Sequence, residues 1–250
     1  MHNPDNKMLT TLGQTRSSQH KNHLLLTADT FVRTTLPGMK KCAAIVHAGP
    51  AMGAAFAQYT AEFEAGGELG STEAQRFLYV IEGSVTVESK KLSAHGYAYL
   101  PSGASHRVIA SKPSRVAVIE KPYQQLPAVA APKAIIASED DVAAHALNDD
   151  PDLQVKCLLP DEMSFDFAVN TMVYQPGAAL SQVEMHIMEH GLIMLEGGGI
   201  YRLGDSWYPV TAGDFIWMGP WCPQWFGAIG KKPAKYLIYK DSNRHPLPNK

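Results

Sequence analysis

One glutamate and two histidines stand close together in "EMHIMEHG", at 184–191. Glu184, His186 and His190 occupy even positions, so an extended chain would point all three side chains to one face. A helix would instead set Glu184 and His186 about 200° apart around its axis, which prevents a joint site. We therefore expect a strand that presents two imidazoles and a carboxylate together. The spacing alone leaves two interpretations open, a divalent metal site or a polar, solvated strand.

A second group of polar side chains lies near the carboxyl end, in "AKYLIYKDSNR". Tyr236 and Lys240 share one face of a predicted strand, whereas Tyr239 faces the other way. Tyr201 begins the strand after a glycine-rich hairpin. Each of these residues also has an ordinary interpretation, as a core or rim tyrosine or a solvated lysine.

The elements that must position these residues are predicted to be strands. Short runs rich in Val, Ile, Phe, Tyr and Leu are separated by Gly, Pro, Ser and Asp at intervals of roughly 8 to 12 residues, which is typical of an all-β sandwich or barrel. The best helix candidate is "SEDDVAAHALN". There Ser138 can cap the helix, and the acidic residues that follow stand at the favourable end of the helix dipole.

The chain contains an internal repeat. "RFLYVIEGSVTV" from Arg76 aligns with "HGLIMLEGGGIY" from His190, and each copy continues into a hairpin and a proline-containing apolar strand. The alignment shifts the numbering by 114 and sets three residues opposite the glutamate and the two histidines: Gly70, Thr72 and Arg76. Because none of these three side chains can bind a divalent cation, we expect one metal site per chain, in the second copy.

Two tandem barrels of this layout resemble the bicupins, which are built from two jelly-roll β-barrels. The resemblance rests on "GYAYLPSGASH" in the first copy, which fits the second cupin motif, and on the ligand-rich strand of the second copy. It implies a fourth ligand at Gln224 in "MGPWCPQWF", where cupins usually carry a histidine. His106, without partners in the first copy, is expected to be a hydrogen-bonded structural histidine.

The resemblance also divides the chain into four segments. We expect an N-terminal arm at 1–30 and an N-terminal cupin barrel without metal at 31–125. A Pro- and Ala-rich linker with the short connecting helix should occupy 126–150, and a C-terminal cupin barrel with the metal site 151–250.

Among the bicupins, the chain is similar to the (S)-ureidoglycine aminohydrolases, a manganese-dependent family of allantoin breakdown. The similarity covers most of the chain, and its specific part is the Glu-x-His-x3-His cluster with glutamine as the fourth ligand. The resemblance implies the metal ligands Glu184, His186, His190 and Gln224. It implies substrate contacts from Tyr201, Tyr236 and Lys240, with Glu184 and Gln224 beside them, and catalytic roles for Glu184, Lys240 and Tyr201.

The implied reaction is the hydrolytic release of ammonia from (S)-ureidoglycine to give (S)-ureidoglycolate, a step of allantoin and purine catabolism. Lys240 would pair with the substrate carboxylate, the two tyrosines would align the ureido group, and Glu184 would be an acid–base group. Two imidazoles, a carboxylate and an amide oxygen suit Mn²⁺, with Fe²⁺ or another divalent ion as alternatives. The family further implies a homo-oligomer.

Two other functions stay open on the sequence. One is a different metal-dependent cupin enzyme, such as an iron dioxygenase or a sugar-phosphate isomerase, although those sites usually carry three histidines. The other is a non-catalytic bicupin that binds or senses a ligand, to which the loss of ligands in the first copy would be no obstacle.

Composition narrows the class of partner. Apolar residues make up 45% and charged residues 18% of the chain, with a net charge of −2, which fits a globular protein with neither a basic footprint for nucleic acid nor a polybasic strip for lipid. No apolar run is long enough for a membrane span, and the polar start lacks a secretory signal, so we expect a cytoplasmic protein with a small-molecule substrate. Three widely spaced cysteines suggest neither disulfides nor a thiolate metal site, and Cys222 should be a small buried residue.

Overall fold

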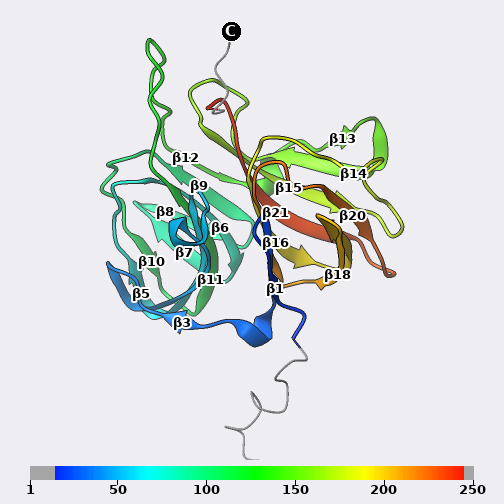
Figure 1. The fold of residues 1–250 in the computed structure, drawn as a ribbon. Helices are drawn as coiled ribbons and strands as arrows, with labels where there is room; N and C mark the ends of the chain where they lie inside the picture. Colours follow the sequence, from blue (N-terminus) through cyan, green and yellow to red (C-terminus); the bar gives the residue numbers. More distant parts are fainter. Residues whose placement is uncertain (1–14, 245–250) are drawn as a thin grey trace, which may run out of the picture.

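The chain folds into two β-barrels that lie side by side (Figure 1). This computed structural model describes residues 15–244, so the beginning of the expected N-terminal arm and the last six residues lie outside the described residues. The expected all-β architecture of two tandem barrels is confirmed. The division of the chain at 30, 125 and 150 stays a prediction.

One sheet forms the first barrel. Its strands are β3 (Arg33–Thr34), β4 (Met39–Ala48), β5 (Ala57–Leu69), β6 (Gln75–Glu82), β7 (Ser84–Val87), β8 (Lys90–Ser93), β9 (Gly96–Leu100), β10 (Val108–Ala110), β11 (Ser114–Lys121) and β12 (Ile135–Ser138). They follow the order β12-β9-β6-β11-β5-β10-β7-β8, with β4 also paired to β5 and β3 to β4. The 3-10 turn η2 (Ala28–Thr30) precedes β3, and η3 (Pro50–Met52) lies between β4 and β5.

The second barrel combines two sheets. Its strands are β1 (Ser18–Gln19), β2 (His23–Leu26), β13 (His145–Leu147), β14 (Asp150–Cys157), β15 (Phe167–Tyr174), β16 (His190–Glu196), β17 (Gly198–Leu203), β18 (Ser206–Thr211), β19 (Phe215–Met218), β20 (Gln224–Ala228) and β21 (Ala234–Asp241). The larger sheet has the order β1-β2-β19-β16-β21-β15-β14-β13, and the smaller has the order β18-β17-β20.

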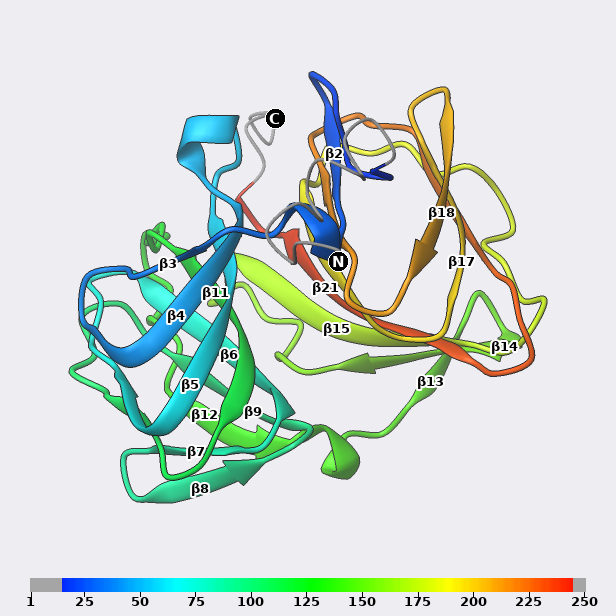
Figure 2. The ribbon, with the colours of Figure 1, turned by 90° about the horizontal axis from the view of Figure 1, so that it is seen from below.

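The N-terminal arm crosses to the second barrel. Figure 2 shows β2 beside the second barrel. It pairs there with β19, and Leu24 lies opposite Trp217. Arg16 forms an ion pair of 2.6 Å with Asp214, whose side chain is 2% exposed. Residues 18–26 therefore form an edge of the sheet that the carboxyl-terminal half of the chain builds.

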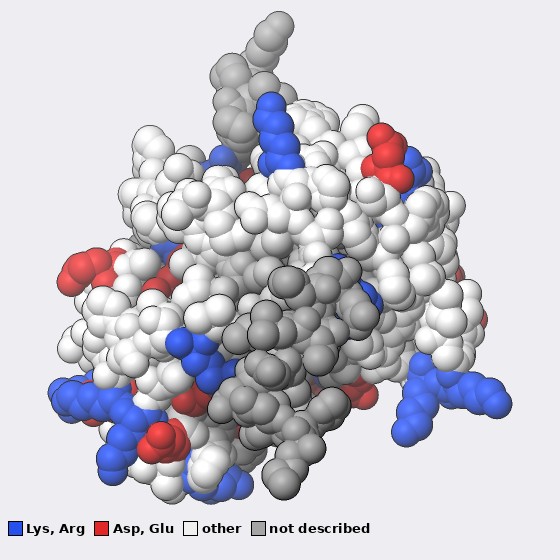
Figure 3. Space-filling model, turned by 60° about the horizontal axis from the view of Figure 1, so that its bottom comes forward, with Lys and Arg blue, Asp and Glu red and all other residues white. Residues whose placement is uncertain are grey.

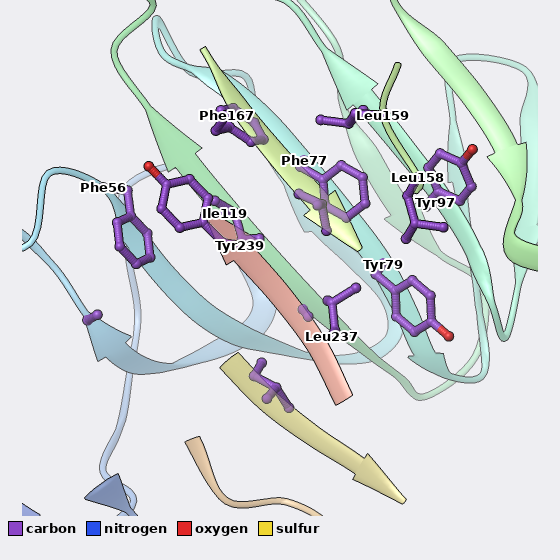
Figure 4. Packing of buried hydrophobic residues seen from close by; sticks show 14 of the residues in the cluster. Phe56, Phe77, Tyr79, Tyr97, Ile119, Leu158, Leu159, Phe167, Leu237 and Tyr239 are labelled. Carbon is purple, nitrogen blue, oxygen red and sulfur yellow. The ribbon is translucent and has the colours of Figure 1, made fainter. Parts of the chain in front are cut away.

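Alternation along β21 sends its side chains to two different places. Tyr236 and Ile238 join the core of the second barrel, whereas Leu237 and Tyr239 pack into a buried cluster between the barrels. We call this cluster the seam; it includes Phe56, Phe77, Tyr79, Tyr97, Ile119, Leu158, Leu159, Phe167, Leu237 and Tyr239 (Figure 4). Because side chains of a strand alternate between its two faces, one strand lines a barrel interior and also joins the two barrels.

The helix expected in 138–148 is wrong except for its first turn. Ser138 does cap a turn, accepting from the Asp140 amide at 3.2 Å, but this turn is the 3-10 turn η4 (Glu139–Asp141) and the chain then returns to strand at β13. Glu139 is 3% exposed and forms an ion pair of 2.8 Å with Lys235 across the seam. Tertiary pairing of this segment with both barrels overrides its helical preference.

The distribution of charged side chains and the state of the cysteines agree with the expectations from composition. Basic and acidic side chains are scattered over the face in Figure 3, without a continuous basic patch on that face. All three cysteines are free, and Cys222 is buried as expected. Within residues 15–244, no helix has the length and apolar character that crossing a membrane requires.

Candidate metal and substrate site

One cavity in the second barrel, of about 250 Å³, brings the candidate site residues together. All seven residues singled out from the sequence line it: Glu184, His186, His190, Tyr201, Gln224, Tyr236 and Lys240. Tyr239 faces the other side of its strand from Tyr236, as expected, and packs in the seam. The cavity is therefore a concave, partly apolar space with a concentrated group of polar side chains, as small-molecule sites usually are.

The continuous strand expected over 184–190 is wrong. Residues 181–189, which we call the ligand segment, are irregular apart from a single bridge between Glu184 and Gln224, and a strand begins only at His190. The Glu184 and Gln224 backbones exchange hydrogen bonds of 2.8 and 2.9 Å, and the Trp221 amide donates to the His186 carbonyl at 2.8 Å. The side chains therefore converge because the segment folds across the start of β20, and not because of strand alternation.

The two imidazoles face one another at the inner end of the cavity. His186 Nε2 and His190 Nε2 are 3.2 Å apart, with the rings nearly perpendicular. Two nitrogen ligands that bind one ion at right angles, each about 2.1 Å from it, would lie about 3 Å apart. The observed separation fits two ligands of a common cation.

Hydrogen bonds around His190 fix which of its nitrogens can bind a metal. Its Nδ1 lies 3.3 Å from the Tyr239 carbonyl oxygen. A carbonyl only accepts, so Nδ1 carries the proton and Nε2 keeps its lone pair toward His186. Burial, followed by the neighbouring His186 and Lys240, lowers the pKa of His190 to about 3. The ring is therefore neutral at neutral pH, the state in which imidazole binds metals.

Gln224 lies beside His186 and Tyr201. Its Nε2 is 2.9 Å from His186 Nε2, and its Oε1 accepts from the Tyr201 hydroxyl at 3.4 Å. In this arrangement the amide nitrogen donates to His186 Nε2 and occupies the lone pair of that atom. A half-turn of the amide would present Oε1, the atom a metal needs, and would leave Nε2 as a donor to Tyr201.

Glu184 lines the same cavity but is half-buried and has not closed onto the imidazoles. Among residues 15–244, no three His, Cys, Asp or Glu side chains are already grouped as one metal cluster. Two imidazoles and an amide at contact distance, with Glu184 on the same wall, nevertheless form a donor set that fits a divalent ion. A bound ion would have to draw the Glu184 carboxylate inward.

The tyrosines of the cavity are neutral hydrogen-bond donors. Burial is the main cause that raises the pKa of Tyr201 and of Tyr236 well above the usual phenol value. The Tyr236 hydroxyl lies 2.7 Å from that of Tyr174, a buried residue that the sequence analysis did not select. These hydroxyls therefore stay protonated over the physiological range.

Asn170 is a second residue that sequence reasoning missed. It lines the cavity from β15, and with its amide oxygen turned to Lys240 that oxygen accepts from Lys240 Nζ at 3.2 Å while the amide nitrogen donates to the Val169 carbonyl at 3.0 Å. A polar asparagine within the apolar run "FAVNTMVY" was the available signal. Asn170 thus holds the Lys240 ammonium in place at the cavity wall.

The first barrel fills the matching place with an ion pair. β6 and β11 set Arg76 opposite Glu120, just as β16 and β21 set His190 opposite Lys240. The Arg76 guanidinium is 2.6 Å from the Glu120 carboxylate and also donates to the Gly70 carbonyl at 2.7 Å. An internal cation therefore stands where the second barrel keeps the neutral imidazole of His190.

His106, the histidine of the cupin motif in the first copy, also has a hydrogen-bond partner. Its Nδ1 lies 2.9 Å from the Glu88 carboxylate. This pairing agrees with the structural role expected from its isolation in the sequence.

Comparison with known proteins finds close relatives over almost the whole chain. Residues 170–239 match the Cupin domain family. The (S)-ureidoglycine aminohydrolase of Arabidopsis thaliana is 38% identical over 244 residues, covering 94% of this chain and 80% of that protein. The (S)-ureidoglycine aminohydrolase of Escherichia coli strain K12 is 30% identical over 237 residues, covering 90% of each chain. The crystal structure of protein Ylba from E. coli matches with a TM-score of 0.83 at 29% identity, covering 96% of this chain and 99% of that one.

Proposed function

We propose a function from one premise: this chain belongs to the (S)-ureidoglycine aminohydrolase family of cupin proteins, because it matches curated members at 30% and 38% identity over nearly its full length. The protein is a hydrolase that releases ammonia from (S)-ureidoglycine to give (S)-ureidoglycolate in purine catabolism. The observation that carries the proposal is the single cavity lined by all seven residues that the sequence matches to this family.

Four residues would hold a divalent ion, for which we propose Mn²⁺. His186 and His190 offer Nε2 lone pairs 3.2 Å apart, Gln224 offers its amide oxygen after a half-turn, and Glu184 offers a carboxylate. A hard ion with several oxygen ligands and open positions is what this donor set favours. When bound, the ion would supply Lewis-acid polarisation and a template for the substrate.

Lys240 would bind the carboxylate of the substrate. Its ammonium lies on the cavity wall, where Asn170 accepts one of its hydrogen bonds. The remaining donors can face a carboxylate, and a charge-assisted hydrogen bond of this kind is roughly twice as strong as a neutral one. This pairing would fix one of the substituents on the reacting carbon and so help to select the (S) isomer.

The reacting carbon of ureidoglycine carries an amine, a ureido nitrogen and a carboxylate. Once the amine has gained a proton, its C–N bond breaks as the ureido nitrogen donates electron density, and ammonia leaves. Water then adds at that carbon and releases a proton, which leaves the hydroxyl group of the product. Tyr201 and Tyr236 would donate hydrogen bonds that align the ureido group, since burial keeps both phenols protonated. Glu184 would carry the proton to the departing amine, because it lines the cavity beside the proposed ligands.

The test is ammonia release from freshly made ureidoglycine by protein loaded with Mn²⁺, measured without oxygen and compared with protein treated with a chelator. Activity that depends on manganese and not on oxygen supports the hydrolase and excludes a dioxygenase. Lys240→Met should raise KM roughly 100-fold, as expected for losing a buried charge pair, while manganese content stays at the wild-type level. An equal loss of manganese in this variant would contradict the role given to Lys240.

Assembly into a homo-oligomer and a cytoplasmic location are further parts of this proposal that come from the family and the sequence. Light scattering of the purified protein tests the first. A measured mass equal to that of one subunit, at the concentrations used in the assay, would contradict the proposed homo-oligomer.

A further inference from the structure

We infer that Glu189 is a positioning residue through which the first barrel holds the metal ligands of the second. The inference deepens the proposed function and rests on it, since it assumes that His186 and His190 bind the ion. It also gives the first barrel, where Arg76 stands in the place of His190, a task in the chemistry of its neighbour.

The Glu189 carboxylate is clamped from both barrels. It is 3% exposed and accepts from the Trp217 indole at 2.7 Å and from the Ala55 amide at 3.0 and 3.2 Å. Trp217 belongs to β19 of the second barrel, whereas Ala55 precedes β5 of the first. A buried carboxylate is costly unless hydrogen bonds satisfy it, so these donors fix its position strongly.

The backbone of Glu189 is fixed as well. Its amide donates to the Asp241 carboxylate, and the Asp241 amide donates to the Glu189 carbonyl at 3.2 Å. Since His190 follows directly, the peptide that orients its imidazole is held by both the main chain and the side chain of Glu189.

Gly191 brings the first barrel equally close on the other side of His190. A Cβ at Gly191 would lie 2.2 Å from Gln58 Oε1 and 2.7 Å from the Phe56 ring, both of the first barrel. The absence of a side chain therefore allows Gln58 and Phe56 to rest against the β16 backbone. His190 is thus bracketed by two residues that contact the first barrel, while its own ring points into the second.

A purely structural role would predict something different. Glu139 provides the matched comparison, because it is also 3% exposed and is also held by residues of both barrels: Tyr79 of the first and Thr171 and Lys235 of the second. Glu139 lies outside the ligand segment. If the seam matters only for stability, changes at Glu189 and Glu139 should act alike.

The experiment compares Glu189→Ala, Glu189→Gln and Glu139→Gln in the full-length protein. Two quantities are measured: hydrogen exchange of amides 181–190 in metal-free protein, and the Mn²⁺ dissociation constant by calorimetry, both below the thermal midpoint of each variant. For Glu189→Ala we expect faster exchange in 181–190 and Mn²⁺ binding weakened about 10-fold or more, as when an outer partner of a metal ligand is removed. Glu189→Gln should lie between wild type and Glu189→Ala, because the amide oxygen can still accept from Trp217, whereas the NH2 group that replaces the second carboxylate oxygen cannot accept from the Ala55 amide.

Glu139→Gln should lower the thermal midpoint and leave both quantities within twofold of wild type. The inference is overturned if the Glu189 variants show wild-type exchange in 181–190, or if Glu139→Gln loosens this segment equally. Should Glu189→Ala fail to fold, Glu189→Gln, which keeps the shape of the side chain, carries the same test. Failure of the wild type to bind Mn²⁺ would refute the proposed metal site instead, and the exchange measurement would still decide the role of Glu189.

Discussion

The two barrels carry different charged groups at the same pair of strand positions. In the first, Arg76 and Glu120 neutralise each other and the guanidinium also satisfies the Gly70 carbonyl, so no further group is needed. In the second, the matching positions hold His190, which is neutral, and Lys240, so the charge of the lysine is not balanced by the residue opposite it. The difference shows that the fold sets where side chains meet, whereas the residue types decide whether the meeting point is a self-contained ion pair or a neutral imidazole beside an ammonium group.

Removing an imidazole from the second barrel should have the largest effect. We expect His190→Ala to weaken Mn²⁺ binding by more than the about 10- to 100-fold that losing an outer partner costs, and ammonia release should fall with metal content. Metal analysis and the ammonia assay measure the two. Manganese at wild-type stoichiometry in folded His190→Ala would contradict the site.

The counterpart in the first barrel should change stability and not chemistry. Arg76→Met leaves the Glu120 carboxylate without its main partner, and we expect unfolding free energy to fall by about 3 kcal/mol, as when one member of a largely buried pair is removed. Ammonia release at 20 °C should stay within twofold of wild type. Urea unfolding measures the first quantity.

The double variant Arg76→Met with Glu120→Leu provides the control. Because it removes both charges, it should recover most of the lost stability. A loss of activity in either variant at a temperature where it is folded would show that the first barrel does take part in the reaction.

A smaller effect is expected at Asn170, which orients Lys240. Asn170→Ala should raise KM about tenfold, equivalent to about 1.4 kcal/mol for a hydrogen bond to a charged group, and leave Mn²⁺ binding unchanged. Steady-state kinetics with varied ureidoglycine measures this. Asn170→Asp, which still accepts from Lys240, is the control and should keep more affinity than Asn170→Ala unless the added charge repels the substrate carboxylate.

The last prediction concerns His47, a buried histidine of the first barrel, and compares it with His190. Burial is the main cause that lowers the pKa of His47 to about 3, the same value as for His190, but His47 bonds Thr60 at 2.8 Å and stacks on Phe215 in the seam. Its folded-state pKa is below its unfolded value, so its contribution is complete above about pH 6.5 and is lost as the pH falls toward 3. Between pH 7.5 and 5.5 we expect a loss of about 1.4 kcal/mol from this group.

His47→Gln checks this prediction. Urea unfolding at both pH values should show a shallower dependence for the variant than for the wild type. Parallel pH profiles would mean that His47 does not titrate on unfolding in this range.

Much of the site could be chosen from the sequence, although partly for a wrong reason. The spacing of Glu184, His186 and His190 suggested a strand, yet the ligand segment is irregular, and the residues still line one cavity. The internal repeat set Arg76 opposite His190, and the strand pairings place these two residues at matching positions in the two barrels. Asn170 was missed because a lone asparagine in a strand gives no sign that Lys240, two positions along the neighbouring strand, lies within its reach.

The sequence by itself determined the all-β repeat and which half carries the imidazoles, because alternation and residue type are local properties that survive without knowledge of the fold. Only the tertiary structure decided that residues 18–26 complete the second barrel, that 139–141 form a seam contact in place of a helix, and that Glu189 meets the first barrel. These features depend on pairs of groups far apart in the chain. Their energies come from burial and hydrogen bonds that no short stretch of residues can reveal.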